Sequence, residues 1–107
     1  APRGKEKTAG PAGRDRRRAE AEARNEQSRR LRAARERVAA LERQVLEAEQ
    51  LRDALDAQLA DPSTYRTEGL ARSLGERRKA VQESLSRLDR EWDEAVSALE
   101  RAGDASS

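Results

Sequence analysis

The sequence predicts an all-α protein: a two-helix antiparallel coiled-coil hairpin with a flexible basic N-terminal leader. Two apolar stripes, one on either side of Pro62, follow the alternating three- and four-residue spacing of coiled-coil seams. Only 35% of the 107 residues are hydrophobic and 41% are charged, a composition too polar for an ordinary globular core. Because the connection between the stripes is short, we expect the two helices to run antiparallel and to bury their stripes against each other.

The N-terminal part of the chain divides into a leader and a long first helix. Residues 1–13 contain three glycines and two prolines without apolar periodicity, which indicates a flexible linker. We expect the first helix over about residues 15–60, because Arg, Ala and Glu dominate its start. Its seam consists of Leu31, Ala34, Val38, Leu41, Val45, Ala48 and Leu55, with Arg52 on the next seam position. Leu51, Leu55 and Leu59 lie four residues apart, which predicts a stutter that shifts the stripe near the end of this helix.

A turn at residues 61–67 separates the two predicted helices. Asp61 is a good N-cap residue, and Pro62 ends the first helix because it cannot donate a backbone hydrogen bond. The second helix is expected over about residues 68–102, with Gly103 as its C-terminal stop and residues 103–107 as a tail. Its seam consists of Leu74, Val81, Leu85, Leu88, Trp92, Ala95 and Leu99, with Arg78 as the polar interruption.

Pairing the two stripes from the turn outward predicts the register of the hairpin. This pairing brings Val45 near Leu88 and Leu41 near Trp92. The predicted core therefore consists of Leu41, Val45, Leu85, Leu88 and Trp92. We assign Trp92 to this core rather than to the stacking of a nucleobase, because it lies on the apolar seam.

The composition excludes most kinds of chemical site. Without Cys or His, the chain has no thiol chemistry, no histidine acid–base catalysis and no usual zinc site. It also lacks a G-x-x-x-x-G-K-[ST] phosphate loop. The acidic residues among positions 89–94 alternate around the second helix, so they do not converge on one face to form a metal or acid–base site. No run approaches the roughly 20 apolar residues of a membrane span. We therefore expect a cytoplasmic binding module with no catalytic site, metal, cofactor, small-molecule substrate or membrane contact.

Positive charge is concentrated in the N-terminal part of the chain. Residues 1–37 carry 13 basic and 6 acidic side chains, whereas residues 38–107 carry 10 basic and 15 acidic ones. Arginines on a helix can neutralise phosphates independently of sequence, while the absence of aromatic residues in this run argues against base stacking there. The predicted nucleic-acid-binding residues are Arg14, Arg16, Arg17, Arg18, Arg24, Arg29, Arg30 and Arg32. The alternative is a solvated helix with internal pairs such as Arg18 with Glu22.

The turn holds a second group of candidate residues: Asp61, Pro62 and Tyr65. The capping role of Asp61 accounts for its carboxylate. Tyr65 is the only tyrosine in the chain. We expect its amphipathic ring to cover the helix ends and hold the turn closed, with contact to a partner as the alternative.

Four segments in this order resemble the C-terminal domain of ABC-F proteins. The segments are RRRAEAEARN at 16–25, VAALE at 38–42, LADPSTY at 59–65 and EWDE at 91–94. ABC-F proteins are soluble tandem ATP-binding-cassette ATPases that act on ribosomes. The tip sequence followed by the tryptophan segment is the most specific part of the resemblance, whereas the Arg/Ala/Glu background matches any alanine-rich coiled coil.

The resemblance implies a non-catalytic appendage that follows the second ATPase domain of a longer protein. The first residue, Ala1, is not Met, which agrees with a fragment of such a protein. The implied partners are ribosomal RNA or DNA, contacted through arginine and phosphate. The alternative is a structural coiled coil that docks on its own ATP-binding-cassette domains or self-associates. Salt-dependent binding to nucleic acid would distinguish these two functions.

Overall fold

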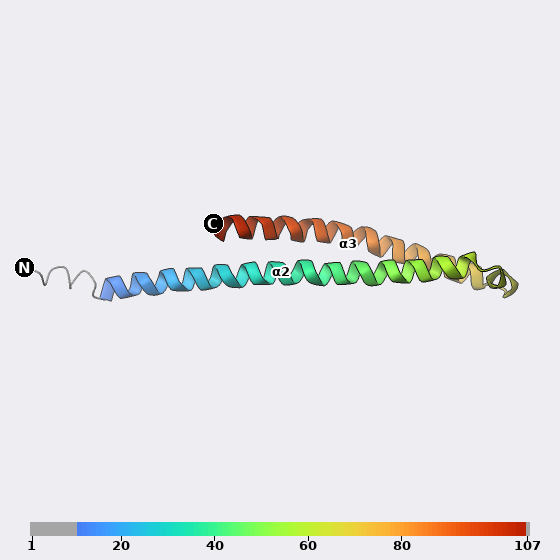
Figure 1. The fold of residues 1–107 in the computed structure, drawn as a ribbon, viewed down its shortest axis with the longest axis horizontal. Helices are drawn as coiled ribbons and strands as arrows, with labels where there is room; N and C mark the ends of the chain where they lie inside the picture. The colour runs from blue at the N-terminus through green and yellow to red at the C-terminus, as the bar shows by residue number, and fades with distance from the viewer. Residues whose placement is uncertain (1–10, 107) are drawn as a thin grey trace, which may run out of the picture.

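The computed structural model describes the backbone of residues 11–106 and the side chains of residues 11–105. The elements are a 50-residue helix α2 (Pro11–Ala60), a short 3-10 helix η1 (Pro62–Arg66) and a 37-residue helix α3 (Leu70–Ser106). Helix α3 turns back along α2 and packs against it, so the chain is an all-α antiparallel hairpin (Figure 1). This arrangement confirms the predicted fold class.

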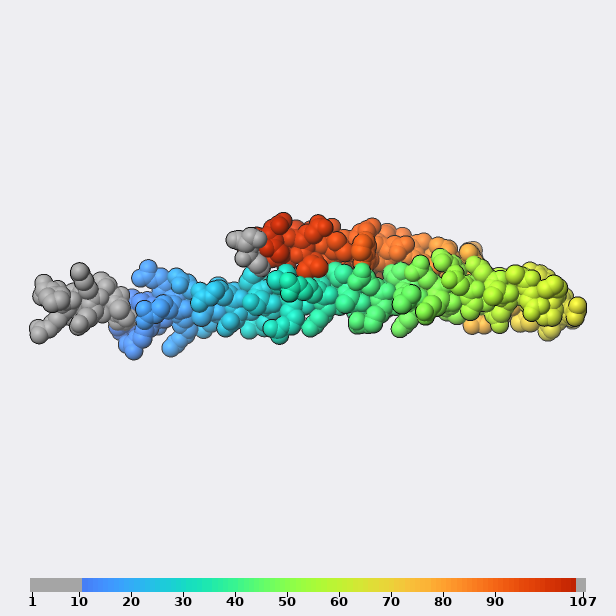
Figure 2. All heavy atoms as spheres, in the orientation of Figure 1, coloured from blue at the N-terminus to red at the C-terminus, as the bar shows by residue number. Residues whose placement is uncertain are grey.

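The two predicted seams form the contact between the helices. Every apolar residue assigned to either seam is buried or half-buried, whereas the residues between them are mostly exposed. The space-filling view shows the two helices in contact over the length of α3 (Figure 2). Burial of one stripe per helix explains why so polar a sequence forms long helices, because packing supplies stability that helix propensity alone does not.

The centre of the seam is a cluster of buried residues from both helices. Leu41 is fully buried (0% exposed) and packs with Leu88 and Ala95, and Val45 and Trp92 pack against this cluster. The cluster around Leu41 thus includes Leu88 and Trp92, the residues of α3 that the predicted register places opposite this part of α2. Further toward the tip, the other predicted core residue, Leu85, is also buried at 4% exposure.

The predicted stutter near the end of α2 is wrong. Leu51 is 43% exposed, whereas the side chain of Arg52 keeps only 29% exposure and holds the seam position. The three- and four-residue spacing therefore continues without a shift through Leu55 to Leu59, both of which are at least partly buried. The long aliphatic part of an arginine can lie along an apolar seam while its guanidinium reaches the surface, here beside Asp53 at 3.3 Å.

The tip contains one more element than the sequence predicted. Asp61 caps the 3-10 helix η1, and Pro62 is its first residue. Helix α3 then begins at Leu70, two residues later than expected. Gly69 explains the delay, because its φ of +77° lies in the left-handed region, which a helix cannot include. The carbonyl of Gly69 accepts the backbone N–H of Ser73 at 3.0 Å, which starts the hydrogen bonding of α3.

Both outer ends of the hairpin are more helical than predicted. The predicted leader at residues 1–13 is wrong for residues 11–13, which belong to α2, while residues 1–10 lie outside the described part of the chain. The predicted tail at 103–107 is wrong as far as Ser106, because α3 continues through Gly103. Glycine permits a left-handed helix end but does not impose one, and Gly69 is the one glycine with a positive φ among the described residues.

The seam predicts different consequences for two leucines of α2. Leu41→Ala should lower the free energy of unfolding by about 2–5 kcal/mol, because it opens a cavity at the centre of the contact. Leu46 is 56% exposed, so Leu46→Ala should change stability by no more than about 0.5 kcal/mol. Urea unfolding followed by circular dichroism measures both values. Equal effects of the two substitutions would contradict this position of the core.

Candidate nucleic-acid interface

Helix α2 extends beyond the end of α3 as a single helix. The side-chain amide of Gln27 donates to the carbonyl of Ala102 at 2.9 Å, which ties the last turns of α3 to α2. We call the part of α2 that precedes this contact, residues 11–26, the overhang. At 1.5 Å per residue it is about 24 Å long. Its last residues, from Ala23 on, lie beside Ala105 near the end of α3, and the rest projects past α3 (Figure 1).

The overhang lacks an apolar stripe. Continuing the seam spacing from Gln27 toward the N-terminus gives Arg24, Glu20, Arg17 and Gly13, none of which is a large apolar residue. A helix with no apolar stripe gains little from pairing with another helix. The overhang therefore offers a second helix no apolar surface to pack against.

Arginines predominate on one side of the overhang. At about 100° per residue, four exposed arginines fall within an arc of about 120°. This basic face consists of Arg14, Arg17, Arg18 and Arg24. Asp15, Glu22 and Glu26 lie beyond Arg18 on one flank of this face, and Glu20 borders its other flank one turn from Arg17 and Arg24. The predicted residue Arg16 lies outside the basic face. The arrangement presents several guanidinium groups in one direction, which the net charge of the segment alone does not reveal.

The basic face has no ion pairs with the described residues. The pair proposed from the sequence between Arg18 and Glu22 is not formed within the described part of the chain. Glu26 instead binds Arg29 at 2.6 Å and Arg30 at 3.2 Å. Hydrogen bonds from Arg29 and then Arg30 lower the pKa of the Glu26 carboxyl. The overhang arginines are therefore available to an anionic partner.

The three remaining predicted residues, Arg29, Arg30 and Arg32, lie where α2 is paired with α3. All three are exposed, but Arg29 and Arg30 are each held by Glu26. The side chains of Arg29 and Arg30 are 65% and 68% exposed, and such exposed pairs contribute little free energy. The eight predicted residues thus fall into three groups: five overhang arginines, the two Glu26-bound arginines that would have to exchange partners, and Arg32 in the paired region.

The tip residues are held by hydrogen bonds within the chain. The Asp61 carboxylate accepts the backbone N–H of Ser63 at 2.9 Å. This bond, followed by the one from the Ser63 hydroxyl, lowers the pKa of Asp61. The Tyr65 hydroxyl donates to the carbonyl of Leu59 at 2.7 Å and so closes the last turn of α2. The ring does not cover the helix ends as expected, because Tyr65 is 63% exposed.

Trp92 belongs to the seam rather than to an open surface. It is half-buried against the central cluster, and its indole N–H is buried without a hydrogen-bond partner among the described residues. A shallow cavity of about 200 Å³ beside it is lined by Glu42, Val45 and Asp89. No group of three or more potential metal-binding side chains occurs in the part of the chain that the structure describes.

Comparison with protein-family models, with curated proteins and with solved structures found no match to this chain. Among the described helices, none is long and apolar enough to cross a membrane. The geometry of the overhang and of the tip is therefore the basis for any functional assignment.

Sequence reasoning missed an ion pair that joins the two helices near the tip. Arg78 donates from Nε to the Asp56 carboxylate at 2.8 Å across the two helices. This hydrogen bond lowers the pKa of Asp56 and, in turn, raises the pKa of Arg78. The available signal was Arg78 itself, a charged residue on an otherwise apolar seam that required an opposite charge nearby.

The Asp56–Arg78 pair predicts a pH-dependent contribution to stability. Because the pKa of Asp56 is lower in the folded than in the unfolded chain, the pair stabilises the hairpin fully above the ordinary pKa of aspartate. This stabilisation is lost as the pH falls through the lowered value. Asp56→Asn should therefore lower Tm at about pH 7 more than at about pH 2.5, as measured by circular dichroism. The control is Asp53→Asn, because Asp53 is 71% exposed. Equal losses from Asp56→Asn at both pH values would contradict this role.

Proposed function

We propose that this chain is a non-catalytic helical module that binds nucleic acid through the basic face of the overhang. The observation that supports the proposal is the concentration of Arg14, Arg17, Arg18 and Arg24 within one arc of a single helix. Guanidinium groups bind phosphate oxygens in a bidentate manner, and several of them along a helix match the repeated charges of a nucleic-acid backbone.

The absence of an apolar stripe on the overhang favours a phosphate partner over a second helix. A coiled-coil partner, from another copy or another domain, would need apolar seam residues where Arg17, Glu20 and Arg24 occur. Phosphate contacts need no such stripe, because their free energy comes largely from the release of condensed counterions. Binding of this kind is independent of base sequence and decreases strongly with salt.

We also propose that the parent protein is an ABC-F ATPase, so that ribosomal RNA or DNA is the partner of this appendage in the cytoplasm. The support is the resemblance of the tip sequence at 59–65 and of the tryptophan segment at 91–94 to the ABC-F C-terminal domain. An ATP-binding cassette encoded directly upstream of Ala1 would agree with this assignment. An upstream sequence of another class would contradict it without affecting the proposal of phosphate binding.

The function predicts a defined change in the salt dependence of binding. Changing Arg14, Arg17, Arg18 and Arg24 to Gln should weaken binding to short DNA and RNA duplexes of any sequence. The slope of log Kobs against log salt concentration is negative for such binding. Each lost phosphate contact makes it less steep by about 0.9 on duplex DNA, so the loss of four contacts makes it less steep by up to about 3.6. Fluorescence anisotropy over a series of salt concentrations measures the slope.

The matched control removes the same charge elsewhere. Arg43, Arg87, Arg90 and Arg101 are exposed residues of the paired region, and their replacement by Gln changes net charge equally. The control variant should retain most of the affinity and slope. Equal losses in both variants would show that net charge, and not the basic face, drives binding. No binding by the unmodified chain at low salt would instead favour a coiled coil that docks on its own ATPase domains.

A further inference from the structure

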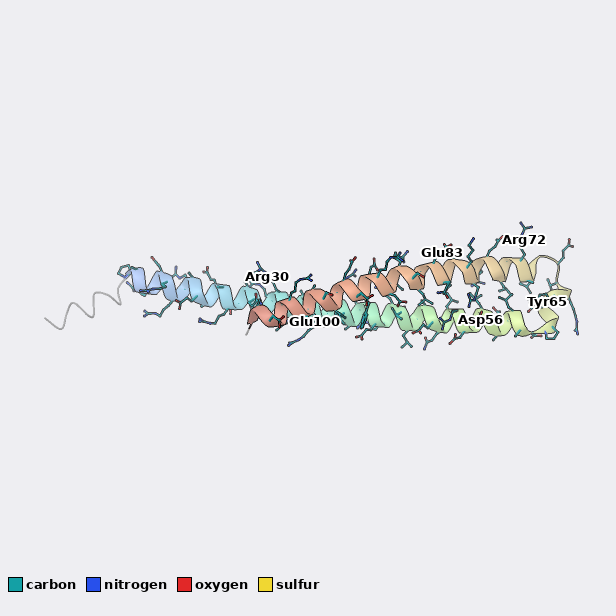
Figure 3. The ribbon with its side chains drawn as sticks, turned by 90° about the horizontal axis from the view of Figure 1, so that it is seen from above. Arg30, Asp56, Tyr65, Arg72, Glu83 and Glu100 are labelled. Carbon is teal, nitrogen blue, oxygen red and sulfur yellow. The ribbon has the colours of Figure 1, made fainter. Side chains whose placement is uncertain are left out.

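The tip presents the one tyrosine of the chain on its surface. Tyr65 is 63% exposed although its hydroxyl donates to the Leu59 carbonyl. The hydrogen bond fixes the end of the side chain, so the ring cannot turn inward to cover the helix ends. A large aromatic surface is therefore held in the solvent at the far end of the hairpin from the overhang (Figure 3).

The backbone beneath Tyr65 is firmly held. The hydroxyl of its neighbour Thr64, a residue only 6% exposed, donates to the carbonyl of Gln58. Asp61 caps the 3-10 helix, and Thr64 also donates its backbone N–H to the Asp61 carbonyl at 3.1 Å. A side chain on such a preorganised turn loses little conformational entropy when it binds a ligand.

Two arginines lie close to the exposed ring in the sequence of the tip. Residues 61–72 carry the basic residues Arg66 and Arg72 and the acidic residues Asp61 and Glu68, and Asp61 is the cap of η1. Arg66 follows Tyr65 directly and is exposed. Arg72 is also at the tip end of α3 (Figure 3), and it contacts Glu76 at 3.5 Å in a pair whose side chains are 87% and 71% exposed. So exposed a pair is weak, which leaves the Arg72 guanidinium able to bind a phosphate.

We propose that the tip is a second nucleic-acid site, which stacks an unpaired nucleobase on Tyr65 while Arg66 and Arg72 bind the adjoining phosphates. An exposed aromatic ring beside basic side chains is the combination by which proteins bind single strands. The overhang has the charge but no aromatic residue, so it is suited to backbone contacts alone. The tip end of α2 lies about 50 Å from the overhang at 1.5 Å per residue, and the tip site functions independently of the overhang.

Fluorine NMR tests the stacking directly. Because Tyr65 is the only tyrosine, 3-fluorotyrosine gives the full chain a single ¹⁹F resonance that reports on the tip. Single-stranded oligothymidylate should shift this resonance, whereas an abasic strand with the same number of phosphates should leave it nearly unchanged. A resonance that stays fixed with both strands overturns the proposal and would favour a protein as the partner of the exposed ring. Equal shifts with both strands also overturn stacking, because they would report phosphate contacts only.

Two substitutions separate the ring from the hydroxyl. Tyr65→Phe and Tyr65→Ala both lose the bond to Leu59, but only Tyr65→Phe keeps the ring. Tyr65→Ala should weaken oligothymidylate binding by about fivefold or more, and Tyr65→Phe should retain it. Equal weakening by both variants would assign the effect to the fold of the tip and reject the stacking site.

The measurements are best made on the full chain with the four arginines of the basic face changed to Gln. Residual binding then comes from the tip, so the tip proposal and the overhang proposal can fail separately. Persistence of the ¹⁹F shift in this variant supports an independent site at Tyr65. Its disappearance would overturn that independence, even if the overhang binds duplexes as proposed.

Discussion

The pairing of one apolar stripe with another is the interaction on which this structure depends. The hairpin is a single layer of side chains thick, and Leu41 and Leu55 are the largest fully buried residues among those described. Neither helix has another surface to bury, so both remain helical because the stripes meet in register. Register in turn determines which charges approach across the seam, as Asp56 and Arg78 do. The same constraint leaves most other side chains exposed to solvent.

Functional surfaces in such a molecule arise at its ends, where the pairing stops. At the open end, the stripe of α2 stops near Gln27 while the helix continues, which produces an overhang with a basic face. At the closed end, the chain must reverse within nine residues, and the hydrogen bonds that achieve this reversal hold Tyr65 outward. The paired rod between the ends fixes their separation. Two sites with different chemistry, one for phosphates and one for a base, are therefore proposed on a single rigid support.

The candidate site was only partly predictable from the sequence. Composition located the arginines, because a dense basic run is visible without a structure. The sequence did not predict which arginines form the basic face and which are bound by Glu26, because this depends on helical phase and on which partners lie within reach. The expected role of Tyr65 was half correct: its hydroxyl closes the turn, but its ring is exposed. Exposure of a turn residue depends on the path of the backbone, which local sequence does not determine.

The sequence by itself determined the all-α class, the two seams, the antiparallel direction and the position of the turn at Pro62. Each of these follows from local periodicity or from the restricted backbone of proline. Tertiary structure decided between the two continuations of the seam that the sequence offered, in favour of Arg52 over Leu51, and it alone showed that α3 continues through Gly103. Both outcomes depend on the surface of the opposite helix. A seam position accepts a long polar side chain when its stem can be covered and its charge can reach solvent. A glycine remains helical when nothing in the surrounding structure favours a left-handed turn.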